Sequence, residues 1–390
     1  MRRQLPSSNV AAPKLKIGFV FDASLDKNEG VAQYVLILSR WLASEGHEVH
    51  YLVGETKRTD IPNLHSLSRN ITVRFNHNRT PIPLPVRMKS IRRLVTREQF
   101  DVLHVQVPYS PALAAKVIRA ASPRTAVVGT FHVAPHSRLV TTANRMLGVL
   151  VRSTLKRFDV MLATSEPARQ FALQTFKIDS KVEGLPIELD KFVGAKPLTR
   201  YAKGLNVVFL GRLVERKGCG LLLKAVAHAV AEGIWPHDAR VIVCSDGPLR
   251  AELEKYTADH QLTDIVEFTG FISEADKPRY LASADVVVYP STGGESFGVV
   301  LLEAFGAARG MVLAGNNPGY ASVMAPRPEA LFDPLDTTQF AVKLVNALID
   351  PRARQAAHAW QQAYSKQFDV ARVGARTLAI YQQALHKRRG

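Results

Sequence analysis

The sequence predicts two doubly wound α/β domains in tandem, each an open parallel sheet with helices on both faces. Two series of short apolar runs support this prediction, because within each series the runs alternate with helical segments. The runs are continuous in Val, Ile, Phe and Leu, which is typical of strands that are buried on both faces of a parallel sheet. A chain of 390 residues is long enough for two such domains.

The first domain is predicted over 15–192, after a disordered leader at 1–14 that has no periodicity. A helix is expected over 31–46. The strands are expected, in order, at 16–22, 48–53, 71–75, 101–107, 125–131 and 159–165. A stretch rich in Pro, Gly and basic residues, 193–204, is the predicted linker.

The second domain is predicted over 205–365. Its strands are expected at 206–211, 239–246, 265–271, 285–291 and 311–316. No strand follows the helical segment 366–390, which is a candidate to cross back to the first domain. Two open parallel sheets in tandem make the cleft between them the expected ligand site.

Positive charge is concentrated in the first half of the chain. Residues 1–200 contain 30 Lys and Arg against 15 Asp and Glu, a net charge of +15 out of +17 for the whole chain. Such asymmetry is typical of a domain that faces a polyanion, either a nucleic acid or an anionic lipid surface. Solubility is the plainer alternative.

Cysteine content and hydropathy restrict the compartment. With only Cys219 and Cys244, a disulfide framework is excluded, a thiolate metal site is not favoured, and a reducing cytoplasm is expected. No apolar stretch approaches the roughly 20 residues of a membrane span. The N-terminus has no apolar core of a signal peptide, so neither a span nor secretion is expected.

The loop after the first strand of the second domain carries two cations. Arg212 and Lys217 lie between Gly211 and Gly218, and a helical segment follows. Two cations at a helix N-terminus can hold a diphosphate and neutralise charge on a leaving group. The alternative is that both are ordinary solvated cations. A P-loop ATPase is not indicated, because G-x-x-x-x-G-K-[ST] is absent.

Two glutamates follow the buried strand at 285–291. Glu295 and Glu303 are eight residues apart, which on a helix is about 80° of rotation, so both carboxylates can line one wall of a cleft. Glycines flank Glu295, and an apolar run separates it from Glu303. The alternative is a pair of exposed glutamates on an ordinary helix.

Two further positions are candidates because of their place at strand ends. His132 follows the strand at 125–131, where ligands bind in parallel sheets, although a core or capping histidine is the alternative. Gly30, before the first helix, would let the backbone approach a phosphate, unless the turn alone requires it. His104, inside a buried strand, is interpreted as structural.

The segment 86–99 is predicted to be a basic amphipathic helix. Its cations fall on one arc of a helical wheel, opposite its apolar residues. The cations are Lys89, Arg92, Arg93 and Arg97. They can meet anionic lipid headgroups at about 1 kcal/mol each, with the apolar face packed on the domain or dipped into the interface. A soluble helix with a solvated face is the alternative.

With these motifs the chain resembles the retaining glycosyltransferases of family 4, which have the GT-B architecture of two facing Rossmann-like domains. The resemblance spans about residues 15–385 and rests on the Gly30 turn, G-R-L-x-x-x-K-G at 211–218, S-D-G-P at 245–248 and the E-x₇-E motif at 295–303. Within the family, G-G-E-S-F-G-V-V-L-L-E, G-T-F-H, P-I-P and D-V-L-H are most similar to phosphatidylinositol mannosyltransferases of actinobacteria.

The resemblance implies a role for each matching position. The catalytic residues would be His132, Arg212, Lys217 and Glu295. The substrate-binding residues would be Gly30, Gly211, Asp246, Gly247, Phe271, Ser296, Phe297, Gly298 and Glu303. The donor would be GDP-mannose or a UDP-hexose, and no metal would be required. The absence of an Asp-x-Asp motif agrees with the last expectation.

The implied roles differ between these positions. Arg212 and Lys217 would bind the nucleotide diphosphate, Glu303 the ribose, and Glu295 the donor hexose. Gly30 would make room for the diphosphate. The chain departs from the family pattern just before that glycine, because a glutamate at 29 replaces a glycine and adds a carboxylate near the expected phosphate.

The predicted function is a retaining hexosyltransferase that moves mannose or glucose from a nucleotide diphosphate sugar to a lipid acceptor. Phosphatidylinositol or a glycolipid would be that acceptor, at the inner face of the plasma membrane. The alternatives are a soluble family 4 enzyme with a small-molecule or polysaccharide acceptor, and a nucleotide-sugar 2-epimerase. A nucleic-acid partner is not expected, because the sequence has no aromatic platform, RNP-type motif or zinc finger.

Overall fold

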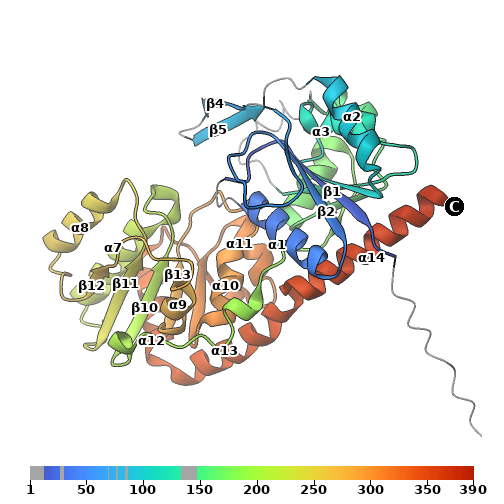
Figure 1. Ribbon diagram of the computed structural model, residues 1–390. Helices are drawn as coiled ribbons and strands as arrows, with labels where there is room; N and C mark the ends of the chain where they lie inside the picture. Colours follow the sequence, from blue (N-terminus) through green and yellow to red (C-terminus); the bar gives the residue numbers. More distant parts are fainter. Residues whose placement is uncertain (1–12, 27–29, 69, 76–77, 84–86, 133–146) are drawn as a thin grey trace, which may run out of the picture. The chain divides into compact units, whose positions relative to one another are not determined.

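The computed structural model describes residues 13–26, 30–68, 70–75, 78–83, 87–132 and 147–390, and of 69–86 no side chain is described (Figure 1). By their contacts the residues form two compact units. Unit 1 comprises Met1–Thr130, Met146–Met161 and Leu378–Gly390, and unit 2 comprises Phe131–Arg145 and Leu162–Thr377. The leader predicted at 1–14 lies outside the described residues except for its last two positions. The predicted boundaries at 192, 204 and 365 stay predictions.

The first large sheet has seven strands in the order β3-β2-β1-β6-β7-β8-β9. The pairs β2–β3, β1–β2, β1–β6, β6–β7 and β8–β9 are all parallel. The strands are β1 (Lys16–Phe21), β2 (Glu48–Val53), β3 (Leu64–Ser66), β6 (Val102–Gln106), β7 (Ala126–Phe131), β8 (Val160–Ala163) and β9 (Lys181–Val182).

The second large sheet has six parallel strands in the order β12-β11-β10-β13-β14-β15. They are β10 (Leu205–Leu210), β11 (Ala239–Cys244), β12 (Val266–Phe268), β13 (Val286–Tyr289), β14 (Met311–Gly315) and β15 (Leu331–Phe332). Strands β10, β11 and β13 are buried along almost their whole length, as expected for strands covered on both faces. The parallel α/β class predicted from the apolar runs is confirmed.

Helices connect the strands in both units. Before residue 177 they are α1 (Gly30–Ser44), α2 (Met88–Glu98), α3 (Leu113–Ala120), α5 (Arg152–Leu155), α6 (Glu166–Phe171) and the π-helix η1 (Ala172–Phe176). From residue 219 they are α7 (Cys219–Ala231), α8 (Arg250–Asp259), α9 (Lys277–Ala282), α10 (Val299–Ala307), α11 (Pro318–Met324), α12 (Thr337–Ile349), α13 (Pro351–Ser365) and α14 (Val370–Arg389). The 3₁₀ segments are η2 (Leu189–Lys191), η3 (Thr199–Tyr201), η4 (Glu215–Lys217), η5 (Pro328–Ala330) and η6 (Lys366–Phe368).

One predicted strand belongs to a different sheet. The run at 71–75 was expected in the first parallel sheet, but β4 (Asn70–Phe75) pairs antiparallel with β5 (Asn78–Pro83) as a separate two-stranded sheet. The nearest strand along the chain is β5, only two residues away in the sequence, and β4 pairs with it and not with a strand of the large sheet. This part of the expectation was wrong.

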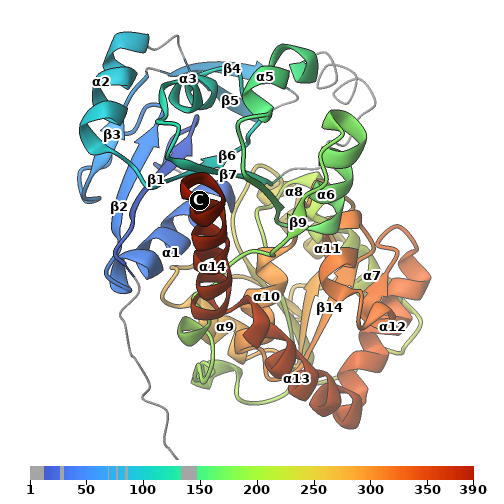
Figure 2. The ribbon, with the colours of Figure 1, turned by 90° about the vertical axis from the view of Figure 1, so that its right-hand side faces the viewer.

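The long C-terminal helix α14 has its first residues in unit 2 and its last in unit 1 (Figure 2). Within unit 1, Tyr381 Oη lies 2.6 Å from His104 Nδ1, and the opposite ring nitrogen of His104 lies 2.6 Å from Thr130 Oγ1. Arg388 pairs with Asp159 at 2.5 Å. His104 is fully buried and both of its nitrogens have partners, which confirms its structural interpretation.

Both large sheets have a point at which the strand order reverses. In the first sheet β1 lies between β2 and β6, and in the second β10 lies between β11 and β13. In open α/β sheets ligands bind outside the carboxyl ends of the strands at such a point. The loops after β10 and β13 therefore mark the place in unit 2 where the predicted site residues must be tested.

Candidate active site

Glu295 is the centre of a charged cluster at the carboxyl ends of β10 and β13. Its Oε1 atom lies 2.7 Å from Lys217 Nζ and 2.9 Å from Arg216 Nη1. Ser291 Oγ lies 3.0 Å from the same oxygen. The Glu295 and Lys217 side chains are 12% and 18% exposed, whereas Arg216 is half exposed. The structure thus brings together Lys217 and Glu295, two residues that the sequence predicted separately.

Local backbone geometry fixes the loop that carries the two cations. Arg216 and Lys217 lie in η4, and α7 begins just after Gly218. Gly218 has φ of +75°, and a Cβ at this position would lie 2.1 Å from the carbonyl oxygen of Pro290. Only glycine permits this close approach of the loop to the end of β13. The N–H of Thr292 donates to the carbonyl oxygen of Arg216 at 3.0 Å, which joins the same two loops.

Glu303 forms a second charged site on α10. This helix is apolar on nearly every side, so it is buried and carries the carboxylate into the interior. Burial raises the pKa of Glu303, and the ammonium group of Lys277 at 3.1 Å opposes that rise. Burial acts to lower the pKa of Lys277, but the charges of Glu303 and Glu274 outweigh it and the pKa is raised. The two groups are largely shielded from solvent, with side chains 15% and 14% exposed.

The stretch between the two carboxylates contains one glycine. Gly298 has φ of +111° and caps the N-terminus of α10, where a Cβ would lie 2.7 Å from the ring of Tyr320. The carbonyl oxygen of Ser296 accepts a hydrogen bond from Ser165 Oγ at 2.9 Å. Phe297 is buried and its ring packs on Phe368 with centroids 5.7 Å apart. The Phe297 side chain thus has a core role, so any ligand contact at this position falls to its backbone.

The loop after β11 lies against the cation loop. Gly247 approaches the backbone of Leu213 so closely that a Cβ would lie 2.5 Å from its carbonyl oxygen. Asp246 is exposed and its carboxylate pairs with Arg250 at 3.3 Å. Phe271, beyond β12, is 82% exposed, which is unusual for a large apolar side chain. These positions are compatible with ligand contact, and their predicted roles stay predictions.

Gly211 and Arg212 begin the loop after β10. The Arg212 side chain is exposed, and among the described residues no ion pair or side-chain hydrogen bond holds its guanidinium group. A Cβ on Gly211 would make only ordinary contacts, the nearest at 3.6 Å, so packing alone does not require glycine there. An unpaired cation at a sheet's switch point is suited to an anionic ligand.

His132 follows β7 and is buried. Burial lowers the pKa of His132 to about 3, so its ring is neutral at physiological pH. In unit 1, Gly30 is the first residue of α1, and a Cβ there would meet no described atom within 4 Å. Packing against the described residues therefore does not require a glycine at position 30. Glu29, singled out beside it, lies outside the described residues.

The predicted basic amphipathic helix is α2, and its two faces are separated as expected. Ile91, Leu94 and Val95 are buried in the core of unit 1. The apolar face is thus packed on the domain, which leaves the cationic face for any surface partner. The exposed cations are Lys89, Arg92, Arg93 and Arg97. No helix among the described residues has both the length and the apolar character of a membrane span.

Three residues of these sites were missed from the sequence. Arg216 lies in the predicted cation loop but had no predicted role, and it pairs directly with Glu295. Lys277 gave no signal, because its partner Glu303 lies 26 residues away. The buried hydroxyl of Tyr289, at the end of β13, has no hydrogen-bond partner among the described residues. Of the three, only Arg216 had a signal in the sequence, because it stands next to the predicted Lys217.

A cavity of about 500 Å³ lies elsewhere in unit 2, among β14, α12 and α13. It contains none of the predicted site residues. We assign the candidate active site to the Glu295 cluster and not to this cavity, because the charged groups and the strand-order reversal coincide only at the former.

Family models match both halves of the chain. Residues 28–186 match the family described as "Glycosyltransferase Family 4", and residues 204–350 match "Glycosyl transferases group 1". A phosphatidyl-myo-inositol mannosyltransferase of Mycobacterium leprae is 30% identical over 76% of this chain and 78% of its own. The enzyme of the same name from Mycolicibacterium smegmatis is 29% identical over 94% of both chains.

A solved structure supports the fold. The crystal structure of a glycosyltransferase from Rickettsia africae matches 96% of this chain and 99% of its own, with a TM-score of 0.74 and 17% identity. At this identity the likeness concerns architecture alone. Together with the two parallel sheets and the relatives above, it shows that the chain is a glycosyltransferase with the GT-B fold and belongs to glycosyltransferase family 4.

Proposed function

We propose that this enzyme transfers mannose from a nucleotide diphosphate sugar to phosphatidylinositol or a related glycolipid, with retention of anomeric configuration. The observation that carries the proposal is the Lys217–Glu295 pair at the switch point of the second sheet. The names of the relatives that align along most of the chain support mannose and an inositol lipid.

The diphosphate would be held by the cations of the loop after β10. Lys217 and the exposed Arg212 can donate hydrogen bonds to phosphate oxygens, and the N-terminus of α7 adds free backbone N–H groups. These groups would stabilise the charge that develops as the bond between the sugar C1 and the diphosphate breaks. We propose that this requires no divalent metal.

Retention places the attacking and leaving groups on the same face of the sugar. The acceptor oxygen would form its bond to C1 as the diphosphate leaves, and the acceptor proton would pass to a diphosphate oxygen. Glu295 would bind hexose hydroxyl groups, Glu303 the ribose, and a neutral His132 would approach the sugar near C1. Products are a glycolipid and a nucleoside diphosphate.

The lipid acceptor would be reached at an anionic membrane surface, at the inner face of the plasma membrane. The exposed cations of α2 support this part, because each lysine or arginine near such a surface contributes about 1 kcal/mol. The high positive charge of the first 200 residues would add a longer-range attraction.

The test of transfer is a donor panel with defined lipid vesicles. The full chain is incubated with vesicles containing phosphatidylinositol and with GDP- and UDP-sugars, with and without EDTA. Released nucleoside diphosphate and the mass of the lipid are measured, and NMR gives the anomeric configuration. We expect GDP-mannose to be consumed with EDTA present and the lipid to gain one hexose. A free epimerised sugar, or transfer only to water-soluble acceptors, would contradict the proposal.

Matched variants test the site. Glu295→Gln and Lys217→Ala should each abolish transfer. Loss of the ion pair should lower the thermal midpoint, so circular dichroism is recorded to confirm that each variant is folded. Glu215→Gln removes an exposed carboxylate from the same loop and should leave the rate near that of the wild type. Wild-type rates for either site variant would show that the cluster has no part in the reaction.

Vesicle sedimentation tests the membrane surface separately. The double variant Arg92→Glu and Arg93→Glu should pellet much less with anionic vesicles. The control, Lys203→Glu with Lys224→Glu, makes the same charge change at exposed positions of unit 2. Equal pelleting of both double variants would assign any binding to overall charge and not to α2.

A further inference from the structure

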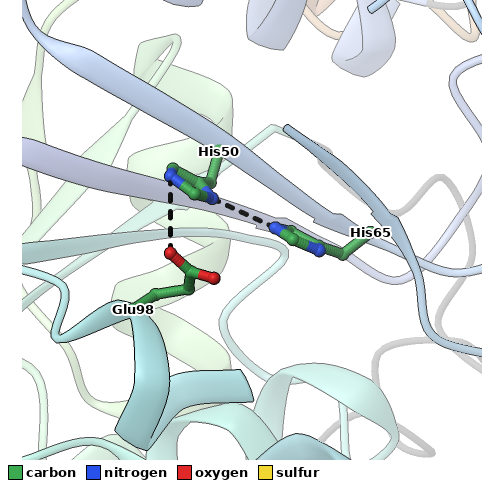
Figure 3. Close-up of side chains that lie close together, drawn as sticks. All are labelled: His50, His65 and Glu98. Carbon is green, nitrogen blue, oxygen red and sulfur yellow. Dashed lines mark hydrogen bonds and ion pairs between the residues drawn. The ribbon is translucent and has the colours of Figure 1, made fainter. Parts of the chain in front are cut away.

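Two histidines and a glutamate meet on unit 1, and none of them belongs to the Glu295 cluster described above. His50 lies on β2, His65 on the edge strand β3, and Glu98 is the last residue of α2 (Figure 3). One potential ligand atom from each lies within 4.8 Å of the other two. In the described part of the chain, no other group of three His, Cys, Asp or Glu side chains is this close.

The separations are close to those of a zinc site. Bonds of about 2.0–2.1 Å in a tetrahedron place neighbouring ligand atoms roughly 3.3 Å apart. His50 Nδ1 and His65 Nε2, the two proposed nitrogen ligands, are 3.0 Å apart (Figure 3). Glu98 is less close: its carboxylate lies 3.9 Å from the other ring nitrogen of His50, Nε2, and the ligand atoms of the three residues lie within 4.8 Å of one another. Glu98 is the last residue of α2 and its side chain can change rotamer, so its carboxylate can turn toward the two nitrogens and become the third ligand.

A second carboxylate already orients His50 as metal sites require. Glu48 Oε1 lies 2.9 Å from His50 Nε2, so this nitrogen carries the proton and donates it to the carboxylate. The lone pair of His50 Nδ1 then points toward His65. Histidine ligands of metals almost always donate their other N–H in this way, because the bond fixes the tautomer and the ring orientation.

A metal ion at this site would have to compete with two cations that already pair with the carboxylates. Lys16 Nζ lies 2.8 Å from Glu48 and 3.1 Å from Glu98, and Arg97 lies 2.6 Å from Glu98. A metal would displace Lys16 from Glu98, while Glu48 and solvent can still accept its hydrogen bonds. His65, which donates to His50 Nδ1 without a metal, would carry its proton on Nδ1 instead of Nε2.

We propose that His50, His65 and Glu98 bind one zinc ion, and that the ion joins the C-terminal end of α2 to the β2–β3 edge of the sheet. A water molecule would complete the tetrahedron. Imidazole with one carboxylate suits zinc and its neighbours in the first transition row better than magnesium or calcium. The ion would have a structural role, so it is independent of the metal-free transfer proposed for unit 2.

The experiment measures metal on the full chain with no affinity tag. The protein is treated with EDTA, desalted, incubated with ZnCl₂ or MgCl₂, desalted again, and analysed by mass spectrometry for metal content. The thermal midpoint is recorded with each metal, and the Co²⁺-loaded protein is examined for the visible bands of four-coordinate cobalt. The variants are His65→Ala, Glu98→Gln and Glu48→Gln, with circular dichroism of the metal-free forms to confirm folding.

We expect one zinc per chain, a higher thermal midpoint with zinc but not with magnesium, and tetrahedral cobalt bands. His65→Ala and Glu98→Gln should lose all three signals, and Glu48→Gln should bind zinc about 10–100-fold more weakly. The controls His237→Ala and Glu45→Gln change exposed residues and should behave as the wild type. A wild type without zinc, or a folded His65→Ala that keeps its zinc, would overturn the proposal.

Discussion

Acid should destabilise unit 2 through His132, because this ring is buried in its neutral form. The side chain is 5% exposed, and burial lowers the pKa of His132 to about 3. In the unfolded chain a histidine titrates at about 6.5. Between these two values the unfolded state binds a proton that the folded state does not. The stability associated with the neutral ring is therefore fully present above about pH 6.5 and is lost as the pH falls toward 3.

The magnitude follows from the same two pKa values. Each pH unit below about 6.5 costs about 1.4 kcal/mol of unfolding free energy per histidine, so a change from pH 7.5 to 5.0 costs about 2 kcal/mol. For a unit of this size that corresponds to roughly 4–8 °C in Tm. His132→Gln removes the titrating group while keeping a polar side chain. Urea unfolding of both proteins at the two pH values isolates the His132 contribution.

The wild type should lose about 2 kcal/mol more than His132→Gln between pH 7.5 and 5.0. His237→Gln, at an exposed position, is the control and should show the pH dependence of the wild type. If wild type and His132→Gln had the same pH dependence, the ring would not be buried in neutral form. The proposal that a neutral His132 ring lies beside the donor sugar would then fail, because a charged imidazolium would be attracted to the diphosphate.

Three further variants test the site in unit 2. Gly218→Ala should lower the free energy of unfolding by at least about 2 kcal/mol, because the added Cβ would lie 2.1 Å from a carbonyl oxygen. Gly233→Ala is the control: its φ is also positive, +69°, but its Cβ would meet open space, so its Tm should fall less. Lys277→Met should lower the free energy of unfolding by about 2 kcal/mol in urea, and adding Glu303→Gln should recover part of the loss. Arg212→Ala should raise the donor KM by about tenfold or more in steady-state kinetics with no change in Tm, and a lower Tm would assign it a structural role.

The strands that the sequence predicted well are those buried on both faces. The run at 48–53 coincides with β2 and the run at 285–291 contains β13, because a continuous apolar run has few other structures available to it. The short strands β9 and β15 have two residues each, too few for any periodicity. The 71–75 run has strand composition, but composition does not specify the partner. Its partner β5 begins only three positions after β4 ends, and nothing in the run itself indicates that the two strands pair with each other.

The site was predicted position by position but not as a set of contacts. Glycines and charges at strand ends indicated Lys217 and Glu295, because parallel strands place their carboxyl ends at one edge. That their side chains meet at 2.7 Å depends on η4 and on the close approach at Gly218, which only the folded chain reveals. Lys277 was missed for the same reason, since an ion pair between α9 and α10 leaves no trace in local sequence.

The pairing of Glu295 explains how the cation loop is stable without a ligand. Arg216 and Lys217 are adjacent, and their like charges would repel if no carboxylate lay between them. Glu295 accepts one hydrogen bond from each and holds both at the end of β13. Since an ammonium group has three donors and a guanidinium group five, each cation keeps donors for phosphate oxygens while it stays bound to Glu295. The carboxylate thus positions in advance the groups that a diphosphate needs, and the binding energy does not have to order them.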